Sequence, residues 1–270
     1  MQVETAQSWA DVQELLFEGS WNPALGRFRS PSAFRGLSQS NYELITTLMR
    51  LGGPYQQLEK HILRNFTKYA HRDVVERDSW WHWLSVAQHH GLPTRLLDWT
   101  HSPFIALHFA TANTEKFDCD GAVWCIDYET IHQRLPRHMQ TELVKEGANS
   151  FTTEVLARAV RTLDELDNLS ADPFLLFFEP PSMDDRIVNQ FALFSVMSNP
   201  AIGLDTWLEE HPELGRKVVI PAALKWEIRD KLDQCNITER VLFPGLDGLT
   251  SWLKRHYSPK NTNPTSAGTS

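Results

Sequence analysis

The 270-residue chain has little cysteine and no excess of positive charge. Its three cysteines, Cys119, Cys125 and Cys235, are odd in number and lack the spacing of a metal-binding set. This pattern favours reduced thiols in a cytoplasmic protein. The formal net charge of −8 argues against general binding to nucleic acids or to membrane surfaces, because no basic excess exists to attract phosphates.

Long apolar runs are missing as well. No uninterrupted apolar stretch of about 18 residues occurs, so the sequence predicts no membrane-spanning helix. The first residues, Met1 to Thr5, contain no basic segment followed by an apolar run, and they do not resemble a signal peptide. We therefore expect neither a membrane anchor nor secretion.

The chain does contain enough apolar and aromatic residues to form a large hydrophobic core. Hydrophobic residues make up 41% and charged residues 22%, which is ordinary for a folded protein and far from the composition of disorder. Ten tryptophans and fourteen phenylalanines can bury a large apolar area. The adjacent Trp80, Trp81 and Trp83 point in different directions on a helix, which favours core packing over a base-stacking surface.

Hydrophobic periodicity and capping residues predict helices and strands in an irregular order. The expected helices cover about 8–18, 40–51, 54–69, 79–90, 102–110, 152–166, 222–235 and 245–257, and the expected strands cover 33–37, 121–127, 174–178, 192–197 and 217–220. Because helices dominate the first half and strands the second, we predict a single α+β domain with a mixed or antiparallel sheet built mainly from the second half.

Polar residues are concentrated in one segment, Gln88 to Ala110. Gly91 ends one helix and Ser102 begins the next, and the intervening 92–100 is expected to be irregular. Its apolar residues would anchor it to the core and hold the polar ones rigidly, as in many binding loops. One hypothesis is that the amides after Ser102 bind an anion beside Arg95. The alternative is a structural ion pair between Arg95 and Asp98.

Metal binding is not expected. The adjacent His89 and His90 diverge by about a hundred degrees on a helix, so they are poor joint ligands for one ion. We predict that no metal is required.

Several separated motifs occur together in this chain. They are Phe34-Arg35-Gly36, the run AQHHGLPTRLLDWT at 87–100, Ser102-Pro103, Arg186-Ile187 with Gln190, and LFPGLDGL at 242–249. This pattern resembles the FRG domain family over about residues 30–257. The resemblance places the FRG domain at 30–257, which leaves an N-terminal helical extension at 1–29. Residues 258–270 are small and polar with proline and lysine, and they are expected to form a disordered tail.

The resemblance also implies a distant similarity to ADP-ribosyltransferases. Arg35 would take the place of the arginine on their first strand, and the hydroxyl groups between Thr94 and Ser102 would contact ribose. In that superfamily a Gln-x-Glu pattern carries the catalytic acid on a late strand. Here Gln190 is followed by Phe191 and Ala192, so that glutamate is absent from this position.

A nucleotide site would need a cation and an acid. A fixed guanidinium such as that of Arg35 binds pyrophosphate with two prongs. A carboxylate stabilises the positive charge that develops on ribose when the bond to nicotinamide breaks, and Asp98 and Glu179 are the candidates. The expected ligand-binding residues are Arg35, His89, Thr94, Arg95, Thr100, Ser102, Arg186 and Gln190.

Two hypotheses of function follow. The first is an NAD-using enzyme, either ADP-ribosyltransferase-like or an NAD glycohydrolase, with the toxin or phage-defence role that the family resemblance implies. The second is a non-enzymatic module that binds a nucleotide-like small molecule or another anion in the same cleft. The sequence identifies no acceptor. Both hypotheses predict that Arg35, Asp98 and Gln190 line one concave surface.

Overall fold

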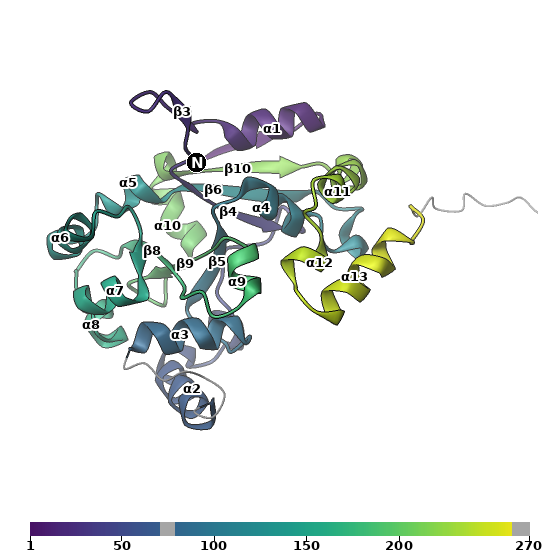
Figure 1. Ribbon diagram of the computed structural model, residues 1–270. Helices are drawn as coiled ribbons and strands as arrows, with labels where there is room; N and C mark the ends of the chain where they lie inside the picture. Colours follow the sequence, from purple (N-terminus) through teal and green to yellow (C-terminus); the bar gives the residue numbers. More distant parts are fainter. Residues whose placement is uncertain (71–78, 261–270) are drawn as a thin grey trace, which may run out of the picture.

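The computed structural model describes residues 1–70 and 79–260. Within them, eight strands form one sheet in the order β1-β10-β6-β4-β5-β9-β8-β7 (Figure 1). The pairs β1–β10 and β7–β8 are parallel and the others antiparallel. The strands are β1 (Gln2–Thr5), β4 (Ser32–Leu37), β5 (Leu96–Thr100), β6 (Gly121–Asp127), β7 (Phe151–Thr152), β8 (Leu175–Glu179), β9 (Ala192–Met197) and β10 (Gly215–Ile220). The predicted α+β fold with a mixed sheet is confirmed.

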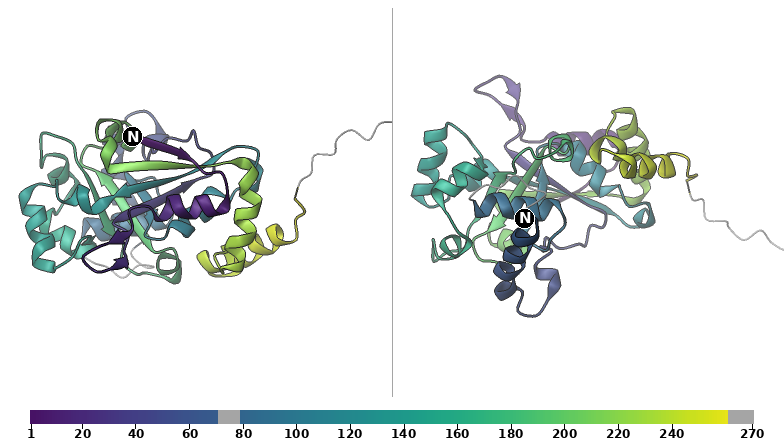
Figure 2. Two further views of the ribbon diagram at one scale, coloured as in Figure 1. Left: turned by 90° about the horizontal axis from the view of Figure 1, so that it is seen from above. Right: turned by 60° about the horizontal axis from the view of Figure 1, so that its bottom comes forward.

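Helices cover both faces of this sheet and gather at its two ends (Figures 1 and 2). They are α1 (Trp9–Phe17), α2 (Tyr55–Ala70), α3 (Trp80–His89), α4 (Pro103–Ala110), α5 (Tyr128–His132), α6 (Arg137–Glu146), α7 (Thr153–Ala159), α8 (Leu163–Asp167), α9 (Asp185–Asn189), α10 (Leu204–Glu210), α11 (Lys225–Gln234), α12 (Glu239–Leu242) and α13 (Leu246–His256). Across residues 1–70 and 79–260, no helix combines the length and the apolarity needed to cross a bilayer.

The strand register sorts the core into two sides. Phe34 on β4 lies opposite Thr100 on β5, and Asp98 lies opposite Phe194 on β9, so these four side chains share one face. On this face, one apolar cluster packs under α3 and α7, and another packs under α1, α4 and α11. The opposite face buries Trp99 and its neighbours under α5 and α10.

The central strands β4 and β5 separate soon after they meet. Both strands are fully described, and a single ladder pair joins them, Phe34 on β4 with Thr100 on β5. In contrast, all six residues of β4 pair with β6. On its β4 side, β5 therefore has no ladder partner on β4 from Leu96 to Trp99. The break in the ladder opens the sheet between two apolar clusters.

Helix α4 packs directly on β4 at Gly36. A Cβ atom at this position would lie 1.8 Å from the Ala106 carbonyl oxygen and 2.6 Å from the Ala110 nitrogen. Any side chain would displace the helix, so only glycine permits this approach. The Ser102 side chain accepts a hydrogen bond from the Ile105 amide and begins α4 as predicted, with Pro103 in its first turn.

Two expectations of local structure are wrong. The segment predicted as irregular, 92–100, contains the central strand β5, because its alternating residues are buried on both faces of the sheet. The helix predicted at 40–51 is reduced to a 3₁₀ turn at Met49–Leu51. Its backbone pairs with another segment instead, since the Leu48 amide donates to the Thr94 carbonyl at 3.0 Å.

The N-terminal region contains strands as well as the predicted helix. Besides α1, residues 1–29 contain β1, which extends the main sheet, and a small hairpin of β2 (Trp21–Asn22) and β3 (Arg27–Phe28). The predicted helix at 152–166 is divided into α7 and α8. Most of the predicted tail, 261–270, lies outside the described residues.

Candidate functional site

A pocket of about 390 Å³ lies where β4 and β5 separate. Its polar lining comes from four elements far apart in the sequence: Arg35 on β4, Asp98 on β5, Gln88 and His89 on α3, and Arg186 and Gln190 at α9. The volume is within the range of small-molecule sites, about 300–1,000 Å³. Arg35, Asp98 and Gln190, which we expected to share a concave surface, all line this pocket.

Arg35 bridges the gap between the two strands. Its Nη1 donates a hydrogen bond of 2.5 Å to the backbone carbonyl of Asp98 and lies 3.9 Å from the Asp98 carboxylate. The Arg35 side chain is 22% exposed, and its buried Nε has no hydrogen-bond partner among the described residues. Burial lowers the pKa of Arg35, although a guanidinium stays charged at neutral pH. One end of this cation is therefore fixed while donor capacity remains.

The Asp98 carboxylate is oriented by a short chain of hydrogen bonds. Gln88 Nε2 donates to both carboxylate oxygens at 3.0 Å, and Gln88 Oε1 accepts a hydrogen bond from the Thr94 hydroxyl. Because the hydroxyl occupies the amide oxygen of Gln88, the amide nitrogen must face Asp98. The Asp98 side chain remains 61% exposed, so it can still meet a ligand.

Helix α9 forms the opposite side of the pocket and is tied to α3. His89 Nε2 lies 2.6 Å from Asp184 Oδ2, and Asp184 begins α9 by accepting a hydrogen bond from the Ile187 amide. Burial would raise the pKa of Asp184, but the Ile187 amide and His89 together lower it. His89 therefore contributes to the pocket and also anchors the segment that carries Arg186 and Gln190.

Aromatic rings complete the lining. Phe34, Tyr42, Phe109 and Phe194 all reach the pocket, from β4, from the chain after it, from α4 and from β9. Two guanidinium groups and one aspartate thus lie among flat apolar surfaces. This combination suits a ligand that carries both an anionic group and a planar ring.

Arg95 lies outside this pocket in a buried ion cluster. Its Nε donates to Glu59 at 2.9 and 2.7 Å, its Nη2 donates to Glu59 at 2.5 Å, and its Nη1 donates to Asp167. The alternative pairing that we considered, Arg95 with Asp98, is not formed. Burial lowers the pKa of Arg95, but the two carboxylates outweigh it and raise the pKa above its usual value.

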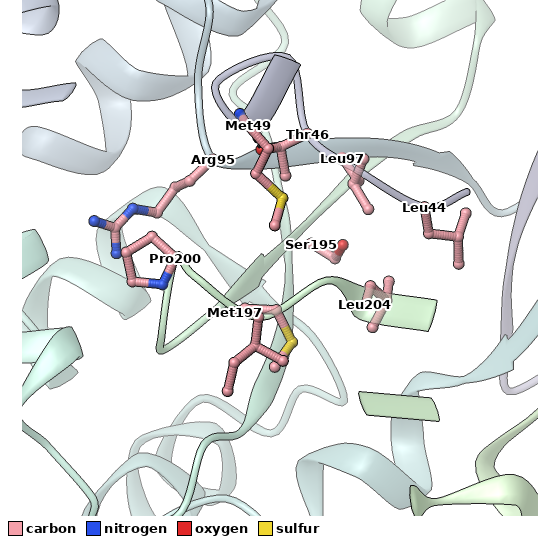
Figure 3. Close-up of a pocket in the computed structure, with 10 residues that line it drawn as sticks. Leu44, Thr46, Met49, Arg95, Leu97, Ser195, Met197, Pro200 and Leu204 are labelled. Carbon is pink, nitrogen blue, oxygen red and sulfur yellow. Dashed lines mark hydrogen bonds between the residues drawn. The ribbon is translucent and has the colours of Figure 1, made fainter. Parts of the chain in front are cut away.

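Arg95 also borders a second, much smaller cavity on the other face of the sheet (Figure 3). Apolar side chains such as Met49, Leu97 and Met197 make up most of its lining. Its volume of about 10 Å³ is at the lower limit for a single water molecule. It cannot hold a nucleotide, so Arg95 is not placed to bind one there.

The other expected site residues divide into two groups. His89 and Thr100 line the pocket together with Arg35, Asp98, Arg186 and Gln190. Thr94 is buried behind Gln88, and Ser102 caps α4, so neither lines the pocket.

Glu179 also lies outside the pocket, at the end of β8. It is 3.9 Å from His101 Nε2, and partial burial raises its pKa. Of the two candidate acids, Asp98 is therefore the one that shares a pocket with Arg35. As for metals, no three His, Cys, Asp or Glu side chains gather as a ligand set within residues 1–70 and 79–260.

Comparison with protein families matches residues 30–119 to the FRG domain. Residues 30–119 of this chain therefore correspond to an FRG domain. The match contains β4 with Phe34-Arg35-Gly36, α3, β5 and α4, and therefore most residues of the pocket. Arg186 and Gln190 lie beyond the matched residues. Searches of curated proteins and of solved structures returned no match.

The sequence did not identify every residue of the pocket. Gln88 stands in the same family run as Asp98, and that shared motif is the signal that could have identified it as a pocket residue. Phe109 stands in the family pattern as well, but Tyr42 gave no signal of its own, because an aromatic side chain at a pocket and one in a core look alike in a sequence.

Proposed function

We propose that the pocket binds a nucleotide-like anionic ligand, with NAD as its candidate substrate, and that the protein is an ADP-ribosyltransferase-like enzyme or an NAD glycohydrolase. The observation that carries this proposal is the placement of Arg35 and Asp98 in one pocket, joined by a hydrogen bond from Nη1 to the Asp98 carbonyl. The pocket thus combines a guanidinium that could bind phosphate with a carboxylate that could stabilise charge on the ribose.

Binding would use the two guanidinium groups of the pocket. Arg35 and Arg186 carry two positive charges against the single carboxylate of Asp98, since Asp184 is paired with His89. A guanidinium matches a pyrophosphate through parallel hydrogen bonds. The rings of Tyr42 and Phe109 offer flat surfaces to a base or to nicotinamide.

The reaction would break the bond between nicotinamide and ribose. The bonding electron pair leaves with nicotinamide, and positive charge develops on the ribose carbon. The Asp98 carboxylate, oriented by Gln88, would stabilise that charge. Water, or the nucleophile of an acceptor, then forms the new bond to this carbon and loses its proton. The products are nicotinamide and either ADP-ribose or an ADP-ribosylated acceptor.

A second candidate function is binding without cleavage. It is favoured by the Gln190-Phe191-Ala192 sequence, which brings no acid into the pocket, and by Glu179, which lies outside it. Both oxygens of Asp98 already accept hydrogen bonds from Gln88, which makes this carboxylate a less available base. The protein would then act as a nucleotide or anion sensor.

Incubation with NAD, followed by measurement of free nicotinamide and of ADP-ribose binding, distinguishes the two candidates. For an enzyme, Asp98→Asn should lower nicotinamide release about 100-fold or more, the effect of removing one charge-stabilising group. The Asp98 backbone carbonyl still accepts from Arg35, so ADP-ribose binding should persist.

Glu179→Gln is the matched control and should release nicotinamide at the wild-type rate. Binding of ADP-ribose without nicotinamide release, alone or with cell lysate as acceptor, would establish the module instead. Absence of both binding and release would reject the nucleotide pocket. Consumption of cellular NAD would in turn account for a toxin or phage-defence role.

A further inference from the structure

We infer that the C-terminal helical pair, α12 and α13, supports the α9 side of the pocket, and that Phe243 and the Leu242 carbonyl are positioning groups for Arg186 and Gln190. The inference rests on the proposed function, because it concerns how the same pocket holds its ligand. The helical pair lies beyond the residues matched to the FRG domain, which end at 119.

Direct contacts join α9 to the chain around α12, beside which it lies in Figure 1. The Arg186 guanidinium carbon lies 5.1 Å from the centroid of the Phe243 ring. Gln190 Nε2 donates to the Leu242 carbonyl at 2.8 Å, and Asn189 Nδ2 donates to the Val241 carbonyl at 2.8 Å. Arg186 and Asn189 of α9, and Gln190 directly after it, are thus held by the three consecutive residues Val241, Leu242 and Phe243.

These contacts decide what Arg186 and Gln190 present to a ligand. Since the Gln190 amide nitrogen is engaged by Leu242, its carbonyl oxygen is the group left to accept a hydrogen bond in the pocket. Arg186 is an exposed side chain on a five-residue helix, and such a side chain would otherwise sample many rotamers. The Phe243 ring restricts it by a cation–aromatic contact. The same ring also packs against Phe109, a residue of the pocket lining.

The position of Phe243 is itself fixed from behind. Arg255 on α13 donates to both oxygens of Glu239 on α12 at 2.7 Å, and to both oxygens of Asp233 on α11 at 3.0 and 2.7 Å. A Cβ atom at Gly248 would lie 1.9 Å from the Phe243 carbonyl oxygen, so α13 packs directly on this residue. Charge pairing and close packing therefore hold the ring in one place.

The test compares three single variants. Phe243→Leu keeps apolar bulk but removes the ring, and Phe243→Tyr restores the ring. Trp252→Leu is the matched control, because it removes the contact between Trp252 and the Arg240 guanidinium carbon, at 4.8 Å. That contact is of the same kind and lies in the same helical pair, but neither residue lines the pocket. If Phe243→Leu does not fold, Phe243→Met takes its place.

The first measurement needs no ligand: the rate at which phenylglyoxal modifies Arg186, followed by peptide mass spectrometry. Loss of one exposed cation–aromatic contact should raise this rate about two- to fivefold in Phe243→Leu. Phe243→Tyr and Trp252→Leu should keep the wild-type rate. An unchanged rate in Phe243→Leu, or an equal rise in Trp252→Leu, would overturn the inference.

The second measurement is ADP-ribose affinity by titration calorimetry, in which Phe243→Leu should weaken binding by about the same two- to fivefold. Phe243→Tyr should restore affinity, and Trp252→Leu should not change it. Equal affinity of Phe243→Leu and wild type would show that the ring does not serve the ligand. If wild type binds no ADP-ribose, the proposed function fails, while the modification rates still decide whether Phe243 positions Arg186.

Discussion

Arg35 and Arg95 come from one family pattern but occupy opposite environments. Arg95 is only 4% exposed, and its donors are taken by the carboxylates of Glu59 and Asp167. Arg35 is held through the Asp98 carbonyl, and its Nε has no partner among the described residues. The difference shows that an arginine is available for ligands only when the fold fixes it without using all of its donors.

The two environments also differ in charge balance. Arg95 pairs with two carboxylates, those of Glu59 and Asp167, and of these three side chains only Asp167 is partly exposed to solvent. Around the pocket, two guanidinium groups face the single carboxylate of Asp98, which is 61% exposed. Stability is therefore expected to depend on the first region and ligand binding on the second.

The largest effect should come from Arg95→Ala. It leaves the buried Glu59 carboxylate without its partner, which should lower the free energy of unfolding by about 3–5 kcal/mol. Urea denaturation measures the change. The double variant Glu59→Gln with Arg95→Met removes both charges and should recover much of the loss. A decrease below about 1 kcal/mol in Arg95→Ala would remove the distinction between the two arginines.

Arg35→Lys should have a smaller effect than Arg95→Ala, and this effect should fall on ligand affinity instead of stability. Lysine keeps the charge but lacks the fork of donors, so the affinity for ADP-ribose should fall by roughly 1.5–3 kcal/mol, and Arg35→Ala should lose at least as much. Titration calorimetry measures the affinity, and melting curves should show both variants folded. Arg35→Ala unfolding while Arg35→Lys binds normally would make Arg35 a second structural arginine.

The pH dependence of stability should come from buried histidines rather than from the pocket. Burial, together with the charge of Arg229, lowers the pKa of His108 to about 3, and burial lowers that of His132 to about 4. Both are neutral in the folded protein, whereas an unfolded histidine binds a proton below about pH 6.5. Protonation of the unfolded chain therefore removes stability as the pH falls through 6.5, by about 2 kcal/mol for each histidine at pH 5.

His108→Gln tests this effect through the difference in unfolding free energy between pH 7 and pH 5. That difference should be about 2 kcal/mol smaller than in wild type, whatever the variant loses at pH 7. Urea titrations at the two pH values give both quantities. Identical pH differences in the two proteins would show that His108 does not titrate as its burial requires.

Local patterns predicted much of the fold. The strands at 121–127 and 192–197 were predicted to the residue, because each is an apolar run bounded by clear turns or polar residues. The strand β5 was missed, since Pro93 and the alternating polar residues favoured a loop. Its burial depends on β9, whose paired residues lie about a hundred positions further along the chain.

The site was predicted in part for a similar reason. Arg35, Asp98, Arg186 and Gln190 came from the family pattern, and the structure places all four in one pocket. Arg95 came from the same pattern, but its partners lie 36 and 72 residues away in the sequence. No local spacing reveals such long-range ion pairs, so the sequence could not separate the buried arginine from the open one.

The contact of Gly36 with α4 has a consequence for how a ligand is accommodated. With no room between the strand and the helix backbone, neither can slide past the other, so Arg35 and Phe109 keep a constant separation. The α9 side is held by side-chain hydrogen bonds and one ring contact, which can rearrange at much lower energetic cost. Recognition should therefore be preorganised on the β4–α4 side and adaptive on the α9 side, and induced fit should begin at α9.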